Sequence, residues 1–278
     1  MNAALSDRND ERQIFPFKDL IVYPYQKFSG AVNMALDFYL AQNIQENDPP
    51  VLRFYGWQPY CLSLGYHQDE KFIDFSALNQ KGYHAVRRPT GGSAILHSEE
   101  LTYGLMAPRK DINVHAIYYL FHKYLANALN DLGFPVSLNY QADKENYLRA
   151  GEERFACFNR PAFAEIKYQN KKVVGSAQKL YRNAVLQHGS ILVGAKQNEI
   201  IDLMNTSEQA KQRYLAILKA SSVSLAEIKP DISLDFNTLI ERLLREFEKK
   251  LNLRIYFKKF DEDHLLQAQK FVHKFKIQ

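Results

Sequence analysis

Residues 83–107 read YHAVRRPTGGSAILHSEELTYGLMA and set the organisation of the chain. The two ends, Tyr83–Arg88 and Ala94–Ala107, carry the apolar pattern of strands, and Pro89–Ser93 form a tight turn with two glycines between them. A glycine-rich turn that binds a nucleotide normally leads from a strand into a helix. Because this turn leads from one strand to another, the pattern argues against a nucleotide-binding βα unit.

The residues before this stretch predict a strand, a helix and two further strands. Asp19–Tyr25 has the pattern of a strand, and Ser29 begins a helix that runs to about Gln42 with apolar residues at helical spacing. Val51–Trp57 and Cys61–Tyr66 are apolar runs joined by a short connection that contains a proline. We expect these two strands to be adjacent and antiparallel.

The residues after the stretch predict a long helix and then antiparallel strands. Asn113 caps a helix that ends near Gly133 and carries one apolar stripe. Three runs between Cys157 and Gly194 have strand character, and they are joined at Gln169-Asn170 and Arg182-Asn183, where asparagine favours tight hairpins. We therefore expect a β-meander over this region.

The remainder of the chain is mainly helical, with a long amphipathic helix expected from about Asp235 to Leu251. The predicted fold class is α+β, with mixed sheets and flanking helices. We divide the chain into a flexible N-terminal arm (residues 1–18), a catalytic domain (residues 19–194) and a C-terminal helical extension packed on the catalytic domain (residues 195–278).

The composition is that of a globular protein. Hydrophobic residues make up 46% and charged residues 24%, which is too apolar for disorder and too interrupted by charge for a membrane span. The N-terminus lacks the pattern of a secretory signal, and two cysteines without a CxxC pair suit a reducing cytoplasm. The net charge of +5 is spread along the chain and fits an acidic protein partner about as well as an ordinary solvated surface. We expect a cytoplasmic monomer that binds neither nucleic acid nor a membrane.

The turn at residues 89–93 is the first candidate site. Arg87 and Arg88 precede Gly91 and Gly92. Glycines let backbone N–H groups approach a ligand closely, and guanidinium groups can hold a phosphate or a carbonyl oxygen. The same pattern is also typical of a hairpin turn beside two solvated arginines, and the residues alone leave both interpretations open.

Cys157 is the second candidate, because it begins a predicted strand after a long polar segment, where a thiol can face a cleft. Taken alone, such a cysteine is more often a small buried hydrophobic residue. Lys171 and Lys172 change that balance, since an ammonium group near a thiol lowers the thiol pKa. Successive residues of a strand point to opposite faces, so at most one of the two lysines can face the thiol.

Histidines and serines give weaker signals. His188 lies in the last predicted strand, and without context such a residue is more often structural than catalytic. We predict no metal site, because no metal-ligand spacing is shared by His67, His84, His97 and His188. No serine lies in a GxSxG motif, which argues against a serine hydrolase of the α/β type.

Three segments in this order resemble the lipoate-protein ligase and octanoyltransferase superfamily: RRPTGGSAILHSEELTY, ACFNRPAFAEI, and KKVVGSAQ with LQHGSIL. The resemblance extends to FSGAVNMALDFYL and VLRFYGWQPYCLSLGYHQ, and so covers about residues 19–194. A cysteine directly before phenylalanine in the second segment is similar to the thiol-dependent octanoyltransferases, whereas ATP-dependent ligases usually carry Gly-Arg-Asn-Asp there. The resemblance implies the fold shared with biotin protein ligases, in which mixed sheets flank a tunnel.

The resemblance also implies roles for individual residues. Cys157 would carry the octanoyl group as a thioester, and Lys172 would assist it. The substrate site would be formed by the arginine–glycine turn, the histidine that follows it and an opposite wall: Arg87, Arg88, Thr90, Gly91, Gly92, His97, Gly175, Ser176, His188 and Gly189.

The implied reaction needs no cofactor, because the octanoyl group arrives on the phosphopantetheine of acyl carrier protein. The acceptor would be a lysine of a lipoyl domain, in the glycine cleavage H protein or a 2-oxoacid dehydrogenase E2. Three alternatives remain open at this point. The chain could be an ATP-dependent lipoate-protein ligase, an amidotransferase between lipoyl domains, or a non-catalytic protein that binds lipoyl domains or a free acyl chain.

Overall fold

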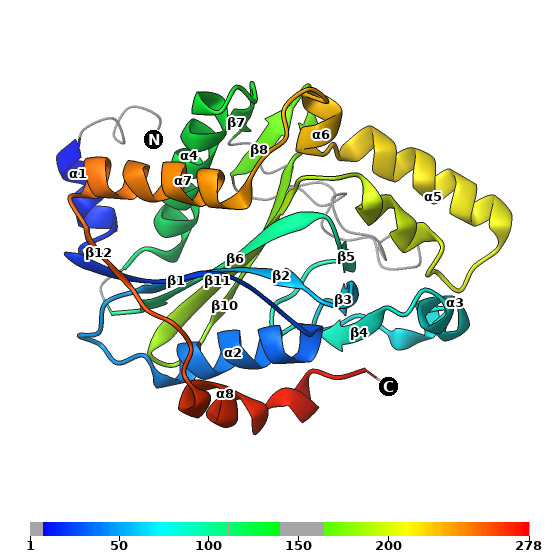
Figure 1. Cartoon of the computed structure of the whole chain (residues 1–278), viewed down its shortest axis with the longest axis horizontal. Helices are drawn as coiled ribbons and strands as arrows, with labels where there is room; N and C mark the ends of the chain where they lie inside the picture. Colours follow the sequence, from blue (N-terminus) through cyan, green and yellow to red (C-terminus); the bar gives the residue numbers. More distant parts are fainter. Residues whose placement is uncertain (1–7, 111, 140–163, 278) are drawn as a thin grey trace.

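A six-stranded mixed sheet forms the centre of the protein (Figure 1). The computed structural model describes residues 8–110, 112–139 and 164–277. The strand order in this sheet is β10-β11-β6-β2-β1-β12. β1 runs parallel to β2 and β12, and the other pairs are antiparallel. The bounds are β1 (Asp19–Phe28), β2 (Val51–Trp57), β6 (Glu100–Pro108), β10 (Val174–Leu180), β11 (Ala184–Leu192) and β12 (Arg254–Phe257).

Two smaller sheets have the orders β4-β3-β5 and β7-β8-β9. Their strands are β3 (Cys61–Leu64), β4 (His84–Arg87), β5 (Ile95–His97), β7 (Ser137–Asn139), β8 (Glu165–Tyr168) and β9 (Lys171–Lys172). The turn at residues 89–93 joins β4 to β5, which confirms that it lies between strands. β4 and β5 both pair with β3, so the turn crosses the end of β3 and is not a hairpin.

The prediction that Val51–Trp57 and Cys61–Tyr66 form adjacent antiparallel strands is wrong. The first run is β2 and pairs with β1 and β6 in the large sheet, whereas the second contains β3 and pairs with β4 and β5. Every residue of β2 and β3 is buried, so neither strand shows the alternation that would mark a single covered face. Nothing in the local pattern therefore indicated that the chain leaves the large sheet after β2 and enters a small sheet at β3.

Residues 164–194 form antiparallel pairs as predicted, but these pairs are divided between two sheets. Gln169 and Asn170 join β8 to β9 with φ angles of 46° and 67°, and β10 pairs with β11 beyond the next turn. The run that was expected to be one strand changes sheets at Val173, because Lys171–Lys172 pair with β8 and Val174–Leu180 pair with β11. The beginning of the expected meander, residues 157–163, lies outside the described residues.

Helices cover both faces of the central sheet (Figure 1). α4 (Val114–Asp131) and α7 (Phe236–Leu251) lie on one face, and α2 (Gly30–Asn43) and α8 (Glu262–Gln269) lie on the other. Asn113 caps α4 as predicted, and α7 begins directly after Asp235, close to its predicted start; both side chains accept backbone hydrogen bonds from the first turns of their helices. The other α-helices are α1 (Arg8–Ile14), α3 (Phe75–Gln80), α5 (Glu208–Ser221) and α6 (Leu225–Ile228).

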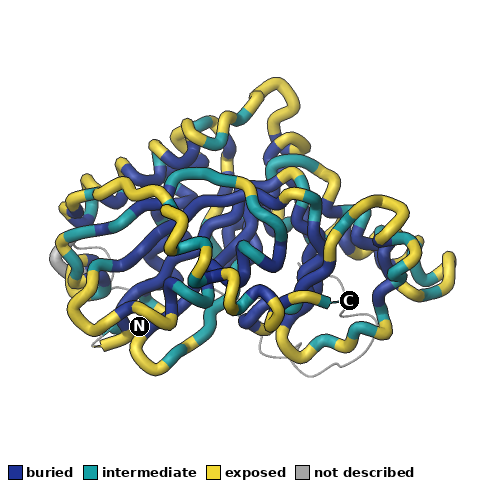
Figure 2. Tube along the Cα trace, turned by 60° about the horizontal axis from the view of Figure 1, so that its bottom comes forward, coloured by how far each residue is buried: buried dark blue, intermediate teal, exposed yellow. Residues whose placement is uncertain are grey.

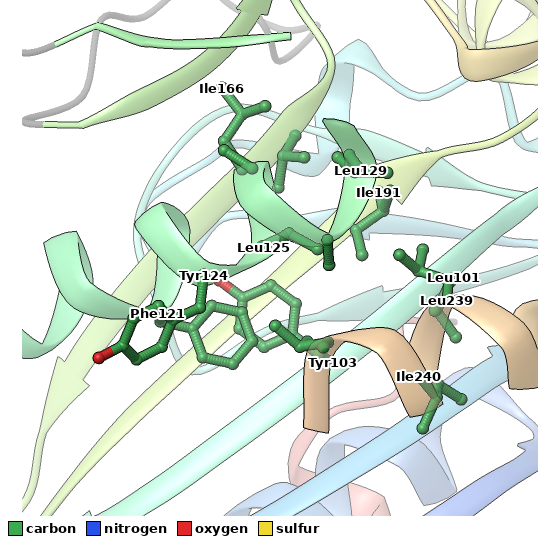
Figure 3. Close-up of a cluster of buried hydrophobic side chains, with 14 of the residues drawn as sticks. Leu101, Tyr103, Phe121, Tyr124, Leu125, Leu129, Ile166, Ile191, Leu239 and Ile240 are labelled. Carbon is green, nitrogen blue, oxygen red and sulfur yellow. The ribbon is translucent and has the colours of Figure 1, made fainter. Parts of the chain in front are cut away.

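The largest hydrophobic core fills the space between the central sheet and the pair α4–α7. In Figure 3, side chains of β6, β8 and β11 face those of the two helices: Leu101, Tyr103, Ile166 and Ile191 from the strands, and Phe121, Tyr124, Leu125, Leu129, Leu239 and Ile240 from the helices. Each such buried side chain contributes about 1.5–3 kcal/mol relative to an exposed one. Figure 2 shows that buried residues lie in the interior of the chain trace and exposed ones around its outside.

Segments on either side of residues 19–194 belong to the same body. Residues 8–14, which were expected in a flexible arm, form α1, and the carboxylate of Glu11 lies 2.6 Å from Nζ of Lys123 on α4. Phe15 is buried in the largest core. At the other end of the chain, β12 adds a parallel strand beside β1, and α7 contributes to that core. None of the described helices is long and apolar enough to cross a membrane.

Candidate active site

A cavity of about 350 Å³ lies beside the β4–β5 turn and extends along β10 and β11 to β2. Nine of the predicted site residues line it: Arg88, Gly91, Gly92, His97, Lys172, Gly175, Ser176, His188 and Gly189. The turn and the paired strands β10 and β11 both contribute to the lining. Part of the lining is apolar and comes from Met34 of α2, Tyr55 and Trp57 of β2 and Ile95 of β5.

Arg87 and Thr90 do not line this cavity. The guanidinium group of Arg87 points to the other side of β4, where NH2 lies 2.6 Å from a carboxylate oxygen of Glu70 and NH1 donates to the carbonyl oxygen of Gln68 at 2.6 Å. Thr90 belongs to the turn and is fully buried. Period-two alternation separates Arg87 from Arg88, so only the second arginine faces the turn.

Arg88 holds the turn in its shape. Its NH2 group donates to the carbonyl oxygens of Gly91 at 2.8 Å and Ser93 at 2.7 Å, and the side chain is 4% exposed. Gly92 has a φ of 98°, which favours glycine. Gly65, at the end of β3, packs against the same turn, because a Cβ atom there would lie 2.0 Å from the carbonyl oxygen of Gly92. Sequence reasoning missed Gly65, although a glycine directly after a buried strand was the available signal.

A buried chain of hydrogen bonds connects the turn to α2 through His188. Nδ1 of His188 lies 3.3 Å from the carboxylate of Asp37, and Nε2 lies 2.7 Å from Oγ1 of Thr90. Asp37 is also held by NH1 of Arg53 at 2.8 Å and by the hydroxyl of Tyr55 at 2.9 Å. Burial lowers the pKa of His188, although the contact with Asp37 opposes this effect.

The polarity of this chain follows from Asp37, which can only accept hydrogen bonds when it is ionised. His188 then carries its hydrogen on Nδ1, and the hydroxyl of Thr90 donates to Nε2. Thr90 in turn accepts from Nε of Arg88 at 3.2 Å. His188 therefore helps to position the turn. Asp37 was not predicted, because it stands within a largely apolar face of α2.

His97 is fixed in a second buried network. Its Nδ1 lies 2.7 Å from the carboxylate of Glu100, its Nε2 lies 2.8 Å from Oγ of Ser63, and its ring stacks on Trp57 with a centroid distance of 3.8 Å. The carboxylate of Glu100 also accepts from the hydroxyl of Ser190 at 2.8 Å. These contacts hold the imidazole and the indole together as one rigid part of the cavity wall.

Lys172 lies at the β10 side of the cavity and is 7% exposed. Its Nζ lies 2.6 Å from a carboxylate oxygen of Glu165, and Lys167 contacts the same carboxylate at 2.8 Å. Burial acts to raise the pKa of Glu165, but the two lysines outweigh it and lower that pKa below its usual value. Lys171 is less buried, which agrees with the expected alternation. Cys157 lies outside the described residues.

Sequence reasoning also missed Glu165 and His122. Glu165 stands at the start of a short strand, where a charged residue is usually exposed, and His122 stands within the apolar stripe of α4. A polar side chain inside an apolar pattern was the signal in both cases, because such groups are stable only when a partner satisfies them. In the described part of the chain, no group of three or more His, Cys, Asp or Glu side chains is arranged to hold a metal ion.

Solved structures that share this fold include lipoate protein ligases. The bipartite ligase of Thermoplasma acidophilum, solved in a study of an archaeal lipoylation system that includes its E2 lipoyl domain, has a TM-score of 0.73 at 18% identity and is covered over 93% of both chains. LipL1 of P. falciparum in complex with lipoate has a TM-score of 0.66 at 17% identity, covering 92% of this chain and 71% of that one. These likenesses establish the fold.

The profile described as lipoyl protein ligase A/B catalytic domain matches residues 29–248, and the chain belongs to this family. Its curated relatives include proteins named octanoyltransferase LipM. The protein from Macrococcus caseolyticus is 36% identical, with 80% of this chain and 83% of the relative covered. The one from Anoxybacillus flavithermus is 34% identical, with 87% and 89% covered. The one from Bacillus subtilis is 34% identical, with 72% and 75% covered.

Proposed function

We propose that this protein is an octanoyltransferase of lipoate biosynthesis. It takes an octanoyl group from acyl carrier protein onto Cys157 and passes it to a lysine of a lipoyl domain. The observation that carries the proposal is the similarity over most of the chain to relatives named octanoyltransferase LipM. The positive net charge of +5 suits acidic partner proteins.

The form of the cavity supports a long, narrow substrate. β2, which carries Tyr55 and Trp57, is separated from β10 by β6 and β11. Three interstrand spacings amount to about 14 Å. Lys172 and Ser176 lie at the β10 side, so an extended acyl chain with its carbonyl group near Lys172 would place its methyl end against the apolar residues of β2 and α2.

The first half of the reaction is a thioester exchange. The Cys157 thiol releases its proton, and the thiolate attacks the carbonyl carbon. A new C–S bond forms, the bond to the pantetheine sulfur breaks, and the departing sulfur takes up the proton that Cys157 released. Lys172, Lys167 and Glu165 together carry one formal positive charge. A net positive charge beside a thiol favours the thiolate, and the thiolate is the nucleophile.

In the second half, the amine of the acceptor lysine attacks the Cys157 thioester. The N–C bond forms, the C–S bond breaks, and the amine proton ends on the sulfur, so that the free enzyme returns. The glycine turn and β10 enclose the reacting carbonyl in this arrangement, and their fixed geometry supplies orientation. Neither half consumes ATP.

Mass spectrometry of the intact protein tests this proposal. We expect octanoyl acyl carrier protein to add one octanoyl group to the wild-type chain without ATP, and an apo lipoyl domain then to remove it. Cys157→Ser should show no stable thioester adduct and no transfer, whereas Cys61→Ala, which alters the only other cysteine, should keep both. Lys172→Met should slow acylation by roughly a hundredfold or more.

Two results would contradict the proposal. Full transfer by Cys157→Ser would remove the thiol from the mechanism. Modification of the lipoyl domain only when free lipoate and ATP are supplied, with release of pyrophosphate, would make the protein a ligase instead.

A further inference from the structure

His122 of α4 contacts the cavity wall through Ser176 of β10. The imidazole is 1% exposed, its Nδ1 lies 2.7 Å from the carbonyl oxygen of Tyr118, and its Nε2 lies 3.0 Å from Oγ of Ser176. Ser176 lines the cavity and is only partly buried. The histidine itself does not line the cavity, so any effect that it has on a substrate must pass through the serine.

The direction of each hydrogen bond in this pair is determined. A carbonyl oxygen only accepts, so Nδ1 of His122 carries the hydrogen that is donated to Tyr118. In the neutral ring Nε2 is then an acceptor, and the hydroxyl of Ser176 donates to it. Burial keeps the ring neutral by lowering the pKa of His122 to about 4.

Ser176 makes a second hydrogen bond, with Tyr103, and its direction can also be determined. Its Oγ lies 2.7 Å from the hydroxyl oxygen of Tyr103, and Tyr103 accepts a hydrogen bond from Nε2 of Gln187 at 3.0 Å. Because the single hydrogen of Ser176 is directed to His122, Tyr103 donates to Ser176. The serine oxygen therefore keeps one lone pair for a group bound in the cavity, and it has no hydrogen left to donate.

Gly189 of the opposite strand makes room for the hydroxyl of Ser176, and the hydrogen bonds to His122 and Tyr103 hold that hydroxyl in place. Gly189 of β11 is paired with Ser176, and a Cβ atom on Gly189 would lie 2.2 Å from Oγ of Ser176. A hydroxyl so held acts as a hydrogen-bond acceptor toward the cavity. It cannot stabilise the oxygen of a thioester or of an oxyanion, since both of these also accept.

We propose that Ser176, oriented by His122, accepts a hydrogen bond from the N–H of the acceptor lysine as its amine attacks the acyl group, which makes His122 a positioning residue for the second half of the reaction. This inference rests on the proposed octanoyl transfer. The amine presents N–H groups while its lone pair forms the N–C bond, and Ser176 holds one of them. No net proton passes to Ser176, because the amine proton ends on the departing sulfur.

Ser176 should affect the two halves of the reaction differently. The nucleophile of the first half is a thiolate, which carries no hydrogen to donate, whereas the nucleophile of the second half is an amine. Loss of the acceptor lone pair on Ser176 should therefore slow transfer and leave acylation nearly unchanged. A merely structural role for His122 would slow both halves together.

Single-turnover kinetics tests this separation. Octanoyl-enzyme is formed from octanoyl acyl carrier protein and followed by mass spectrometry, and the isolated octanoyl-enzyme is then mixed with apo lipoyl domain. We expect Ser176→Ala and His122→Phe each to slow the transfer step about tenfold, the effect of one hydrogen bond. The double variant should be no slower than either single variant, because His122 acts only through Ser176.

Two further variants serve as controls. His122→Gln retains an acceptor for the hydroxyl of Ser176 and should recover most of the transfer rate, and it also replaces His122→Phe if that variant does not fold. Ser137→Ala, at an exposed serine of β7, should change neither half. Equal slowing of both halves, additive losses in the double variant, or an unchanged transfer rate in Ser176→Ala would overturn the inference. If the wild-type chain forms no octanoyl-enzyme at all, the proposed function has failed instead.

Discussion

Acidification should destabilise the folded protein through His122. Its pKa is lowered from the ordinary value of 6.5 to about 4 in the folded state, mainly by burial. Between these values the unfolded chain binds a proton on this residue that the folded chain does not bind, so acid favours unfolding. Stability is fully present above about pH 6.5 and is lost as the pH falls toward 4. The loss at about pH 5, relative to about pH 7.5, is roughly 2 kcal/mol.

The groups around His122 shift its pKa in opposite directions. The carbonyl oxygen of Tyr118 and the carboxylate of Glu165 act to raise the pKa of His122, while Lys172 acts to lower it. His188 also has a lowered pKa, so the whole protein loses more stability in acid than one residue can explain. The contribution of His122 is therefore obtained as a difference between the wild-type chain and the non-titrating variant His122→Gln.

Urea unfolding at the two pH values measures this difference. Fluorescence can follow it, because Trp57 is the single tryptophan and is buried against His97. We expect the free energy of unfolding to fall by roughly 2 kcal/mol more in the wild-type chain than in His122→Gln. His273→Gln, at an exposed position, should behave as the wild-type chain does. Equal losses in the wild-type chain and His122→Gln would refute the assignment of a buried neutral imidazole.

Two other substitutions probe the framework of the site. Gly65→Ala should displace the turn that contains Gly92 by steric contact with its carbonyl oxygen, and should raise KM for the acyl donor at least tenfold without loss of circular dichroism; an unchanged KM would contradict this packing. Arg53→Met should destabilise the fold by about 3–5 kcal/mol, because Asp37 is then a buried charge without its cation. The urea midpoint checks this, and adding Asp37→Asn should restore part of the loss; no recovery would show that the arginine acts by packing alone.

Local patterns predicted the helices well, and the reason is physical. α4 and α7 each have a capping residue and one apolar stripe, and both signals depend only on neighbours within a few turns. Strand pairing depends on residues far apart in the chain. β2 and β3 are buried along their whole length, so no alternation indicated that they belong to different sheets. The change of sheet at Val173 was hidden in the same way, because Val173 and both of its neighbours are buried.

Only part of the site was predicted, because contacts between residues far apart in the chain are not visible in the sequence. Short motifs supplied nine of the residues that line the cavity, since glycines in a turn and polar residues in strands are visible in sequence. The residues that hold them were missed: Asp37, Gly65, Glu165 and His122 act through contacts that cross between elements. Such a side chain has no distinguishing neighbours in sequence, and its role appears only when its partner is known.

These supporting contacts would help the two substrates of the proposed transfer to react in a small space. Asp37 ties the glycine turn to α2 through His188, and His122 ties Ser176 to α4. Both walls of the cavity are thus fixed to helices on opposite faces of the central sheet before any substrate arrives (Figure 1). Orientation set during folding need not be established during each turnover, and it can lower a barrier that involves bringing two groups together. The buried polar chains are costly unless every member is satisfied, so changes in them should affect stability and transfer together.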